Sequence, residues 1–257
     1  MNTRLKITDN DVNGAPPKIR RSTASGRNGG GNRAVQVVIP RNPGTQREKG
    51  DTRDQIFNSK ETLFVGTWNV RTLYAVGQLD ILLHQIRKLR WSVMGIAETR
   101  WTGTGEMNKG DHKIIYTGRE DGKHQEGVAL IMDKKATRAL MGYTTRGSRL
   151  IKARFRTAMG KTTIIQVYAP TSTSTEEEIE DFYENLQEMI QDVPSQEILI
   201  IIGDFNAKVG KDWETWKGAL GKFGYGEENE RGERLLNFCT SNNLRVMNSA
   251  FHQNEGQ

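Results

Sequence analysis

The stretch Glu197-Ile-Leu-Ile-Ile-Ile-Gly-Asp-Phe-Asn206 is a short apolar run that ends in a carboxylate and an amide. Aliphatic and β-branched residues in a run of this length, stopped by Gly203, predict a central strand covered on both faces. Because side chains alternate along a strand, Asp204 and Asn206 are expected on the same side of an extended backbone, at the strand end where open α/β sheets place their sites. The alternative is a strand end whose Asp204 and Asn206 only cap a turn.

Three apolar stretches upstream end in the same way. Leu63-Phe-Val-Gly-Thr-Trp-Asn69 ends in an amide, Trp91-Ser-Val-Met-Gly-Ile-Ala-Glu98 ends in a carboxylate, and Thr162-Thr-Ile-Ile-Gln-Val-Tyr168 ends in a phenol. Strand ends that converge would form an oxygen-rich site of the kind that Mg²⁺ uses, with few protein ligands and several water or phosphate oxygens. Each residue alone is more often structural, whereas the ordered set favours a site.

The ordered motifs resemble those of the endonuclease/exonuclease/phosphatase superfamily. They are Thr67-Trp-Asn69, Glu98-Thr-Arg100, Glu126-Gly-Val-Ala-Leu-Ile131, Val167-Tyr-Ala-Pro170 and Gly203-Asp-Phe-Asn-Ala207. More narrowly, Glu98-Thr-Arg-Trp-Thr-Gly103, Gly118-Arg-Glu-Asp-Gly-Lys-His124 and Gly203-Asp-Phe-Asn-Ala-Lys-Val-Gly210 are similar to the apurinic-endonuclease-like domain of non-LTR retrotransposons of the RTE type, and to host copies of that domain. The resemblance runs from about Thr62 to the carboxyl end. It implies an α/β (α+β) four-layered sandwich, with two mixed β-sheets flanked by helices.

The resemblance also implies roles for the residues at the strand ends. Glu98 would be the principal metal ligand, and Asn69 would support the metal or a phosphate oxygen. Asp204 would orient or deprotonate the attacking water, Asn206 would hold the scissile phosphate, and Tyr168 would donate a hydrogen bond to it. The expected cofactor is Mg²⁺, with Mn²⁺ as an alternative, and the expected partner is DNA. Cleavage of a phosphodiester needs these parts: a cation, a positioned water and donors aimed at the phosphate oxygens.

Three functions follow from these observations. The first is a Mg²⁺-dependent phosphodiesterase or endonuclease that acts on DNA and derives from a retrotransposon. The family's C-terminal Asp-His segment and its last strands have no counterpart before Gln257. This absence leads us to expect an exposed sheet edge, and it favours a second function, an inactive remnant that binds nucleic acid or protein. A phosphatase of the same superfamily is the third. The histidines are expected in the core or in solvent, and they are His84, His112, His124 and His252.

Composition separates the first 60 residues from the rest. This segment is rich in Gly, Pro, Asn, Ser and Arg and holds 12 Lys and Arg against five acids, so we expect residues 1–60 to be a disordered basic tail. Residues 61–257, with 25 basic and 26 acidic residues, would form the domain. One cysteine, Cys239, excludes an internal disulfide, and no apolar run approaches the ~20 residues of a membrane span. The start lacks a secretory signal, and a nuclear or cytoplasmic location without membrane partners is expected.

Within the domain, one strand is predicted to carry a cationic face. In Leu150-Ile-Lys-Ala-Arg-Phe-Arg156, apolar residues alternate with basic ones, and no acid lies between Lys134 and Lys161. Such a face can follow a nucleic-acid backbone and release counterions as it binds. The candidate DNA contacts are Arg149, Lys152, Arg154 and Arg156; the alternative is an ordinary solvated strand.

Helical periodicity completes the α/β order. Thr175 followed by three glutamates predicts a capped helix that ends before Pro194. Segments 79–89 and 233–244 have similar apolar stripes, each leading into a strand. Cys239 lies on the apolar stripe of the last helix and is expected in the core.

Overall fold

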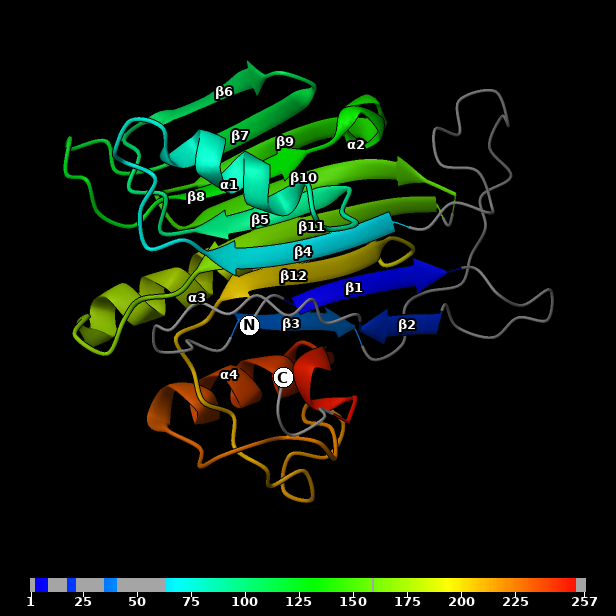
Figure 1. Cartoon of the computed structure of the whole chain (residues 1–257). Helices are drawn as coiled ribbons and strands as arrows, with labels where there is room; N and C mark the ends of the chain where they lie inside the picture. Colours follow the sequence, from blue (N-terminus) through cyan, green and yellow to red (C-terminus); the bar gives the residue numbers. More distant parts are fainter. Residues whose placement is uncertain (1–2, 9–17, 22–34, 41–62, 159, 253–257) are drawn as a thin grey trace.

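The computed structural model describes residues 3–8, 18–21, 35–40, 63–158 and 160–252, with side chains from residue 63 onward. Its elements form two mixed β-sheets (Figure 1). The strands are β1 (Thr3–Thr8), β2 (Lys18–Arg21), β3 (Val35–Pro40), β4 (Leu63–Asn69), β5 (Val93–Ala97), β6 (Thr104–Lys109), β7 (His112–Thr117), β8 (Val128–Met132), β9 (Leu140–Arg146), β10 (Leu150–Thr157), β11 (Gly160–Tyr168), β12 (Ile198–Asp204) and β13 (Leu244–Val246). The helices are α1 (Gln78–Ile86), α2 (Lys134–Ala139), α3 (Glu176–Gln191), α4 (Glu230–Ser241) and the short 3₁₀ helix η2 (Met247–Ser249). Of these, α1, α3 and α4 lie on the outer faces of the sheets (Figure 1).

Each sheet contains one parallel pair of strands at its centre. The seven-stranded sheet has the order β2-β1-β4-β5-β8-β7-β6, and the six-stranded sheet has the order β13-β3-β12-β11-β10-β9. The pairs β4–β5 and β11–β12 are parallel, and the other neighbours are antiparallel. Parallel strands bring their carboxyl ends to the same edge of a sheet, so each sheet presents two strand ends where polar residues follow.

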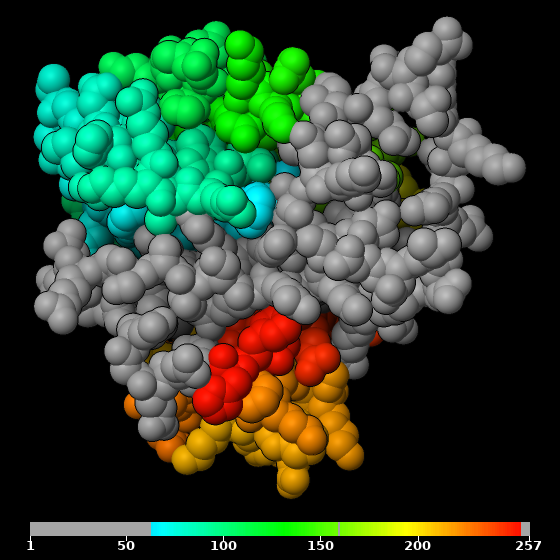
Figure 2. Space-filling model, turned by 45° about the vertical axis from the view of Figure 1, so that its right-hand side comes forward, coloured from blue at the N-terminus to red at the C-terminus, as the bar shows by residue number. Residues whose placement is uncertain are grey.

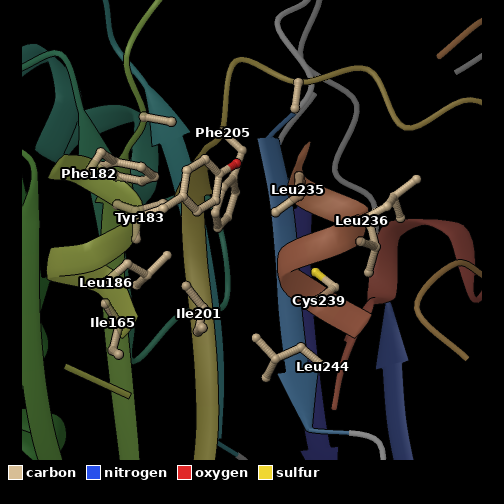
Figure 3. Packing of buried hydrophobic residues seen from close by; sticks show 14 of the residues in the cluster. Ile165, Phe182, Tyr183, Leu186, Ile201, Phe205, Leu235, Leu236, Cys239 and Leu244 are labelled. Carbon is tan, nitrogen blue, oxygen red and sulfur yellow. The ribbon is translucent and has the colours of Figure 1, made fainter. Parts of the chain in front are cut away.

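Three apolar clusters fill the spaces between four layers. The first lies between the two sheets, the second between the six-stranded sheet and helices α3 and α4, and the third between the seven-stranded sheet and α1. Figure 3 shows the second cluster, in which Phe182 and Leu186 of α3 and Cys239 of α4 lie around Ile201 of β12. The predicted four-layered sandwich is therefore confirmed, and Cys239 lies in the core as expected.

The long helices form where their sequence patterns predict them. Helix α3 begins with a capping box, in which Thr175 accepts from the Glu178 N–H and the Glu178 side chain accepts from the Thr175 N–H. Its buried stripe is Ile179, Phe182, Tyr183, Leu186 and Met189. A cap of this kind stabilises a helix by about 1 kcal/mol, but burial of the apolar stripe contributes more.

Gly203 allows the two parallel central strands of the six-stranded sheet to approach at their ends. Its φ of 144° is a value that glycine adopts readily and other residues rarely do. A Cβ added at this position would lie 2.0 Å from the Val167 carbonyl oxygen. Any larger residue would push β12 away from β11. The glycine therefore sets the position of Asp204, which follows it directly.

Three strands in the first 60 residues differ from the expectation of disorder. Strand β1 pairs with β4, β2 pairs with β1, and β3 lies between β12 and β13. The run in β3 is rich in β-branched residues, which favour a strand. The expectation of disorder rested on the average composition of residues 1–60, which is polar. With β1 and β3 in place, β4 and β12 are interior strands, so neither of them is an exposed sheet edge. The rest of residues 1–60 lies outside the described residues, and the tail and domain boundary stays a prediction.

The segment after α4 packs against the loop that follows β12. The Phe223 N–H donates to the Ser249 carbonyl at 2.9 Å, and the Gly221 N–H donates to Ser249 Oγ at 2.8 Å. Figure 2 shows these segments side by side, in red and orange. No helix in the described part of the chain has the length and apolar character needed to cross a membrane.

The pairing of β3 on both sides yields a test of its place in the sheet. Val38 lies opposite Ile201 of β12 and Val246 of β13. Val38→Pro removes a ladder donor from an interior strand, so it is expected to lower the free energy of unfolding by about 2 kcal/mol more than Val38→Ala does. Urea unfolding of both variants measures the difference. Equal losses would show that this segment makes no ladder in solution.

Candidate active site

The ends of β4, β5 and β12 meet at one amide group. Asn69 Nδ2 lies 2.7 Å from Glu98 Oε1 and 2.7 Å from Asp204 Oδ2. Asn69 Oδ1 accepts from the Arg71 N–H at 2.9 Å, which fixes the orientation of the amide. Asn69 ends β4 and Glu98 follows β5, both in the seven-stranded sheet, whereas Asp204 ends β12, a central strand of the other sheet. One amide thus bridges two carboxylates that come from opposite sheets.

Glu98 reaches this position because its backbone leaves the extended conformation. Ala97 belongs to the cluster between the sheets, so a regular strand would turn the next side chain outward. Glu98 has φ of 60°, and its carboxylate turns back toward Asn69. A non-glycine residue in this left-handed region costs free energy, and such costs concentrate at functional sites.

Asp204 serves both the turn and the site. Its Oδ1 accepts from the Asn206 N–H at 2.9 Å, while Oδ2 faces Asn69. The expectation of an extended Asp-x-Asn segment is wrong, because Asn206 has φ of 49° and its amide donates to the Ala169 carbonyl at 2.7 Å. The turn given as the alternative is therefore present, and it leaves one oxygen of Asp204 for the bridge to Asn69.

Tyr168 lies beside Asp204 in the parallel register of β11 and β12. Its side chain is buried in the cluster between the sheets. The Arg149 guanidinium lies 5.3 Å from the centre of the Tyr168 ring and donates to the Tyr168 carbonyl at 3.2 Å. The Tyr168 N–H in turn donates to the Arg149 carbonyl at 2.9 Å, so backbone and side chain of Arg149 both hold Tyr168.

Glu126 links this arginine to the segment that carries Glu98. Glu126 Oε1 lies 2.7 Å from Arg149 Nη2 and 3.3 Å from Arg119 Nη1, and Oε2 accepts from the Ser148 hydroxyl. The Glu126 carbonyl accepts from the Arg100 N–H at 2.8 Å. In the sequence, Glu126 is noticeable only as the first residue of the motif Glu126-Gly-Val-Ala-Leu-Ile131. Its role in linking Arg149 to the segment after Glu98 was not predictable, because it depends on residues far apart in the chain.

The two acids of the site are buried. Asp204 is 0% exposed and Glu98 is 7% exposed. Two buried carboxylates that share a neutral amide repel each other, and a divalent cation would relieve this cost. Their oxygens are the donors that Mg²⁺ prefers, so the residues present fit such an ion. Arg100 lies 4.0 Å from Glu98, and no group of three or more His, Cys, Asp or Glu forms a metal site among the described residues.

The predicted cationic strand lies elsewhere, apart from Arg149. Ile151, Ala153 and Phe155 face the space between the sheets, so the basic side chains of β10 lie on the opposite face, beside α3. Lys152 Nζ lies 3.0 Å from Asp192, and Arg154 pairs with Glu197. The sequence shows no acid near these cations because their partners are far along the chain, at the C-cap of α3 and directly before β12.

Two solved structures are similar to this chain in fold. The endonuclease domain of TRAS1, a telomere-specific non-LTR retrotransposon, is 17% identical and aligns over 69% of this chain and 71% of its own, with a TM-score of 0.45. The catalytic domain of Xenopus laevis APE2 is 13% identical over 68% of this chain and 67% of its own, with a TM-score of 0.47. Likeness at this level carries no weight for activity.

Comparisons of sequence are more specific. Residues 162–254 match the family model described as endonuclease-reverse transcriptase. Craniofacial development protein 2 of Bos taurus is 41% identical over 194 residues, which is 76% of this chain and 32% of that protein. The protein of the same name from Tragulus javanicus is also 41% identical, over 76% of this chain and 33% of its own length. The chain thus spans about a third of the length of the curated relatives that it matches.

The family model, these relatives and the two packed sheets agree with the motifs at the strand ends. The chain is similar to craniofacial development protein 2, and its strand-end motifs and two packed sheets resemble those of the endonuclease/exonuclease/phosphatase superfamily.

Proposed function

We propose that this chain is a Mg²⁺-dependent phosphodiesterase that cleaves DNA and derives from a retrotransposon endonuclease domain. The observation that carries the proposal is the bridge at Asn69, which holds the carboxylates of Glu98 and Asp204 at one place. A phosphodiester carries negative charge, so two buried acids would repel it unless a cation lay between them. The match to the endonuclease-reverse transcriptase model supports the retrotransposon origin.

The roles of the residues follow from their places. Glu98 and Asp204 would hold the cation, with Asn69 supporting both. When bound, Mg²⁺ or Mn²⁺ would neutralise charge that develops on the phosphate oxygens. Asp204 would also accept a proton from a water aimed at the phosphorus, and the hydrogen bond that its Oδ1 accepts from the Asn206 N–H would hold the carboxylate in position for this role.

Tyr168 and Asn206 would donate to the phosphate. Both are held by contacts to the backbone of neighbouring segments, Tyr168 through Arg149 and Asn206 through the Ala169 carbonyl. Donors fixed in this way need not reorganise during the reaction. Preorganised donors of this kind are the main source of transition-state stabilisation in phosphoryl transfer. The pair of Arg149 and Glu126 is then a support for Tyr168, besides any contact of Arg149 with DNA.

Charge-neutral variants test the hydrolysis directly. Asp204→Asn keeps the shape of the side chain and removes its charge, so it is expected to lower the rate of nicking of supercoiled or abasic-site DNA by about 100-fold or more. EDTA is expected to abolish nicking by the parent chain. The control is Asp181→Asn, the same change at an exposed position of α3. Equal nicking by the parent and the Asp204 variant would assign the activity to another site, and no nicking by folded parent protein would favour a binding module.

Repulsion between the acids predicts a second effect, on stability. With Mg²⁺ at 100 times its Kd, the parent chain gains about 2.7 kcal/mol in free energy of unfolding. Glu98→Gln is expected to abolish this gain, yet to be at least as stable as the parent in EDTA, because one of two like charges is gone. Thermal unfolding with and without metal measures both. A variant that Mg²⁺ still stabilises fully would exclude Glu98 as a ligand.

The DNA contacts predicted for the strand β10 remain a hypothesis with its own test. Lys152, Arg154 and Arg156 lie on the outer face of the sheet, and the first two pair with acids. If each contacts a phosphate, replacing all three by Gln reduces the slope of log affinity against log salt by about 1 for each residue. An unchanged slope would show that DNA does not bind to this face.

A further inference from the structure

A pair of aromatic rings lies at the surface near the candidate active site. Tyr74 is 61% exposed, and the centre of its ring lies 4.0 Å from the centre of the His124 ring, with 45° between the planes. Tyr74 belongs to the loop between β4 and α1, and His124 to the loop between β7 and β8. Both loops lie at the end of the sandwich where β4 and β12 terminate (Figure 1).

Both rings are fixed to the segment that follows Glu98. Leu73, the residue before Tyr74, donates its N–H to the Thr99 carbonyl at 2.9 Å and accepts from Trp101 Nε1 at 3.1 Å. His124 Nδ1 lies 3.0 Å from the Arg100 carbonyl oxygen. The residues between Glu98 and Trp101 therefore hold the site carboxylate and both loops. An exposed aromatic pair that is fixed in this way is prepared to receive a flat ligand at little cost in entropy.

The surroundings of the pair are polar and carry positive charge. Arg71 is exposed, and the side chains of Arg100 and Lys123 are 47% and 64% exposed. Two of these cations lie near acids, since Arg100 is 4.0 Å from Glu98 and Lys123 is 3.6 Å from Asp121. Aromatic rings combined with cations are the chemistry by which proteins hold single-stranded nucleic acid, the rings stacking on bases and the cations following the phosphates.

We propose that Tyr74 and His124 form a stacking site for an unpaired nucleobase of the DNA strand bound at the candidate active site. The inference rests on the proposed function for the position of the strand's phosphate, near Glu98 and Asp204. The base is unpaired because a ring at an open surface stacks on the face of a base only when that base has left the duplex. The enzyme would then favour DNA that is single-stranded, frayed or distorted beside the cleaved bond.

Binding to two strands that differ only in their bases tests the proposal. The first is oligothymidylate, and the second is a strand of the same length made of abasic residues, with the same phosphates. Fluorescence anisotropy with Ca²⁺ in place of Mg²⁺ measures affinity with a divalent charge still at the two acids, and a denaturing gel verifies that the strands stay intact. The parent chain is expected to bind oligothymidylate about tenfold more tightly, a difference of about 1.4 kcal/mol.

Variants assign this preference to the pair. Tyr74→Ala is expected to bind both strands equally, Tyr74→Trp to keep the preference, and His124→Ala to reduce it because the tyrosine ring loses its support. Tyr225→Ala, which removes a tyrosine that is 89% exposed in the loop before α4, is the matched control and is expected to behave as the parent. The proposal is overturned if the parent binds the two strands equally, or if Tyr74→Ala keeps the preference.

Nicking of DNA with Mg²⁺, measured on the same preparations, separates this proposal from the proposed function. Base-dependent binding that Tyr74→Ala abolishes, in a chain that nicks nothing, would contradict the hydrolysis and support the stacking site. Metal-dependent nicking without base-dependent binding would overturn the stacking site and leave the hydrolysis supported.

Discussion

The hydrogen bonds from the Asn69 amide to Glu98 and Asp204 join the two sheets at the point where their acids meet. The apolar cluster between the sheets ends at this level, so the amide lies at the border between a dry core and the loops. A neutral amide can satisfy two oxygens but cannot cancel their charge. The arrangement therefore holds two acids together at a cost, and this cost is what a bound cation would recover.

Several local features serve this one meeting point. Gly203 lets β12 approach β11, the left-handed backbone of Glu98 turns its carboxylate inward, and the turn at Asn206 holds one oxygen of Asp204. Each is unfavourable or restrictive by itself. Their concentration at the ends of three strands indicates that the sandwich supports the site, since rigid strands set positions more closely than loops do.

The sequence was sufficient to predict the central strands and the residues at their ends. Apolar runs stopped by single polar residues identify Asn69, Glu98, Tyr168 and Asp204, and strand periodicity is a strong local signal. The conformations of Glu98 and Asn206 were not predictable, because left-handed backbone at a non-glycine residue depends on tertiary contacts. The link through Glu126 and the strand β3 were also missed, since their partners lie far away in the chain. The basic face of β10 was recognised, but the acids that pair with it were not.

The most direct test of this account is the binding of Mn²⁺, followed by electron paramagnetic resonance, to the parent chain, Glu98→Gln and Asp204→Asn. If the carboxylates of the two sheets form one cation site, the parent chain binds one ion at this place and each variant loses it, although both remain folded. If the two variants bind Mn²⁺ as the parent does, the acids that Asn69 brings together are a structural feature of the sandwich and not a metal site.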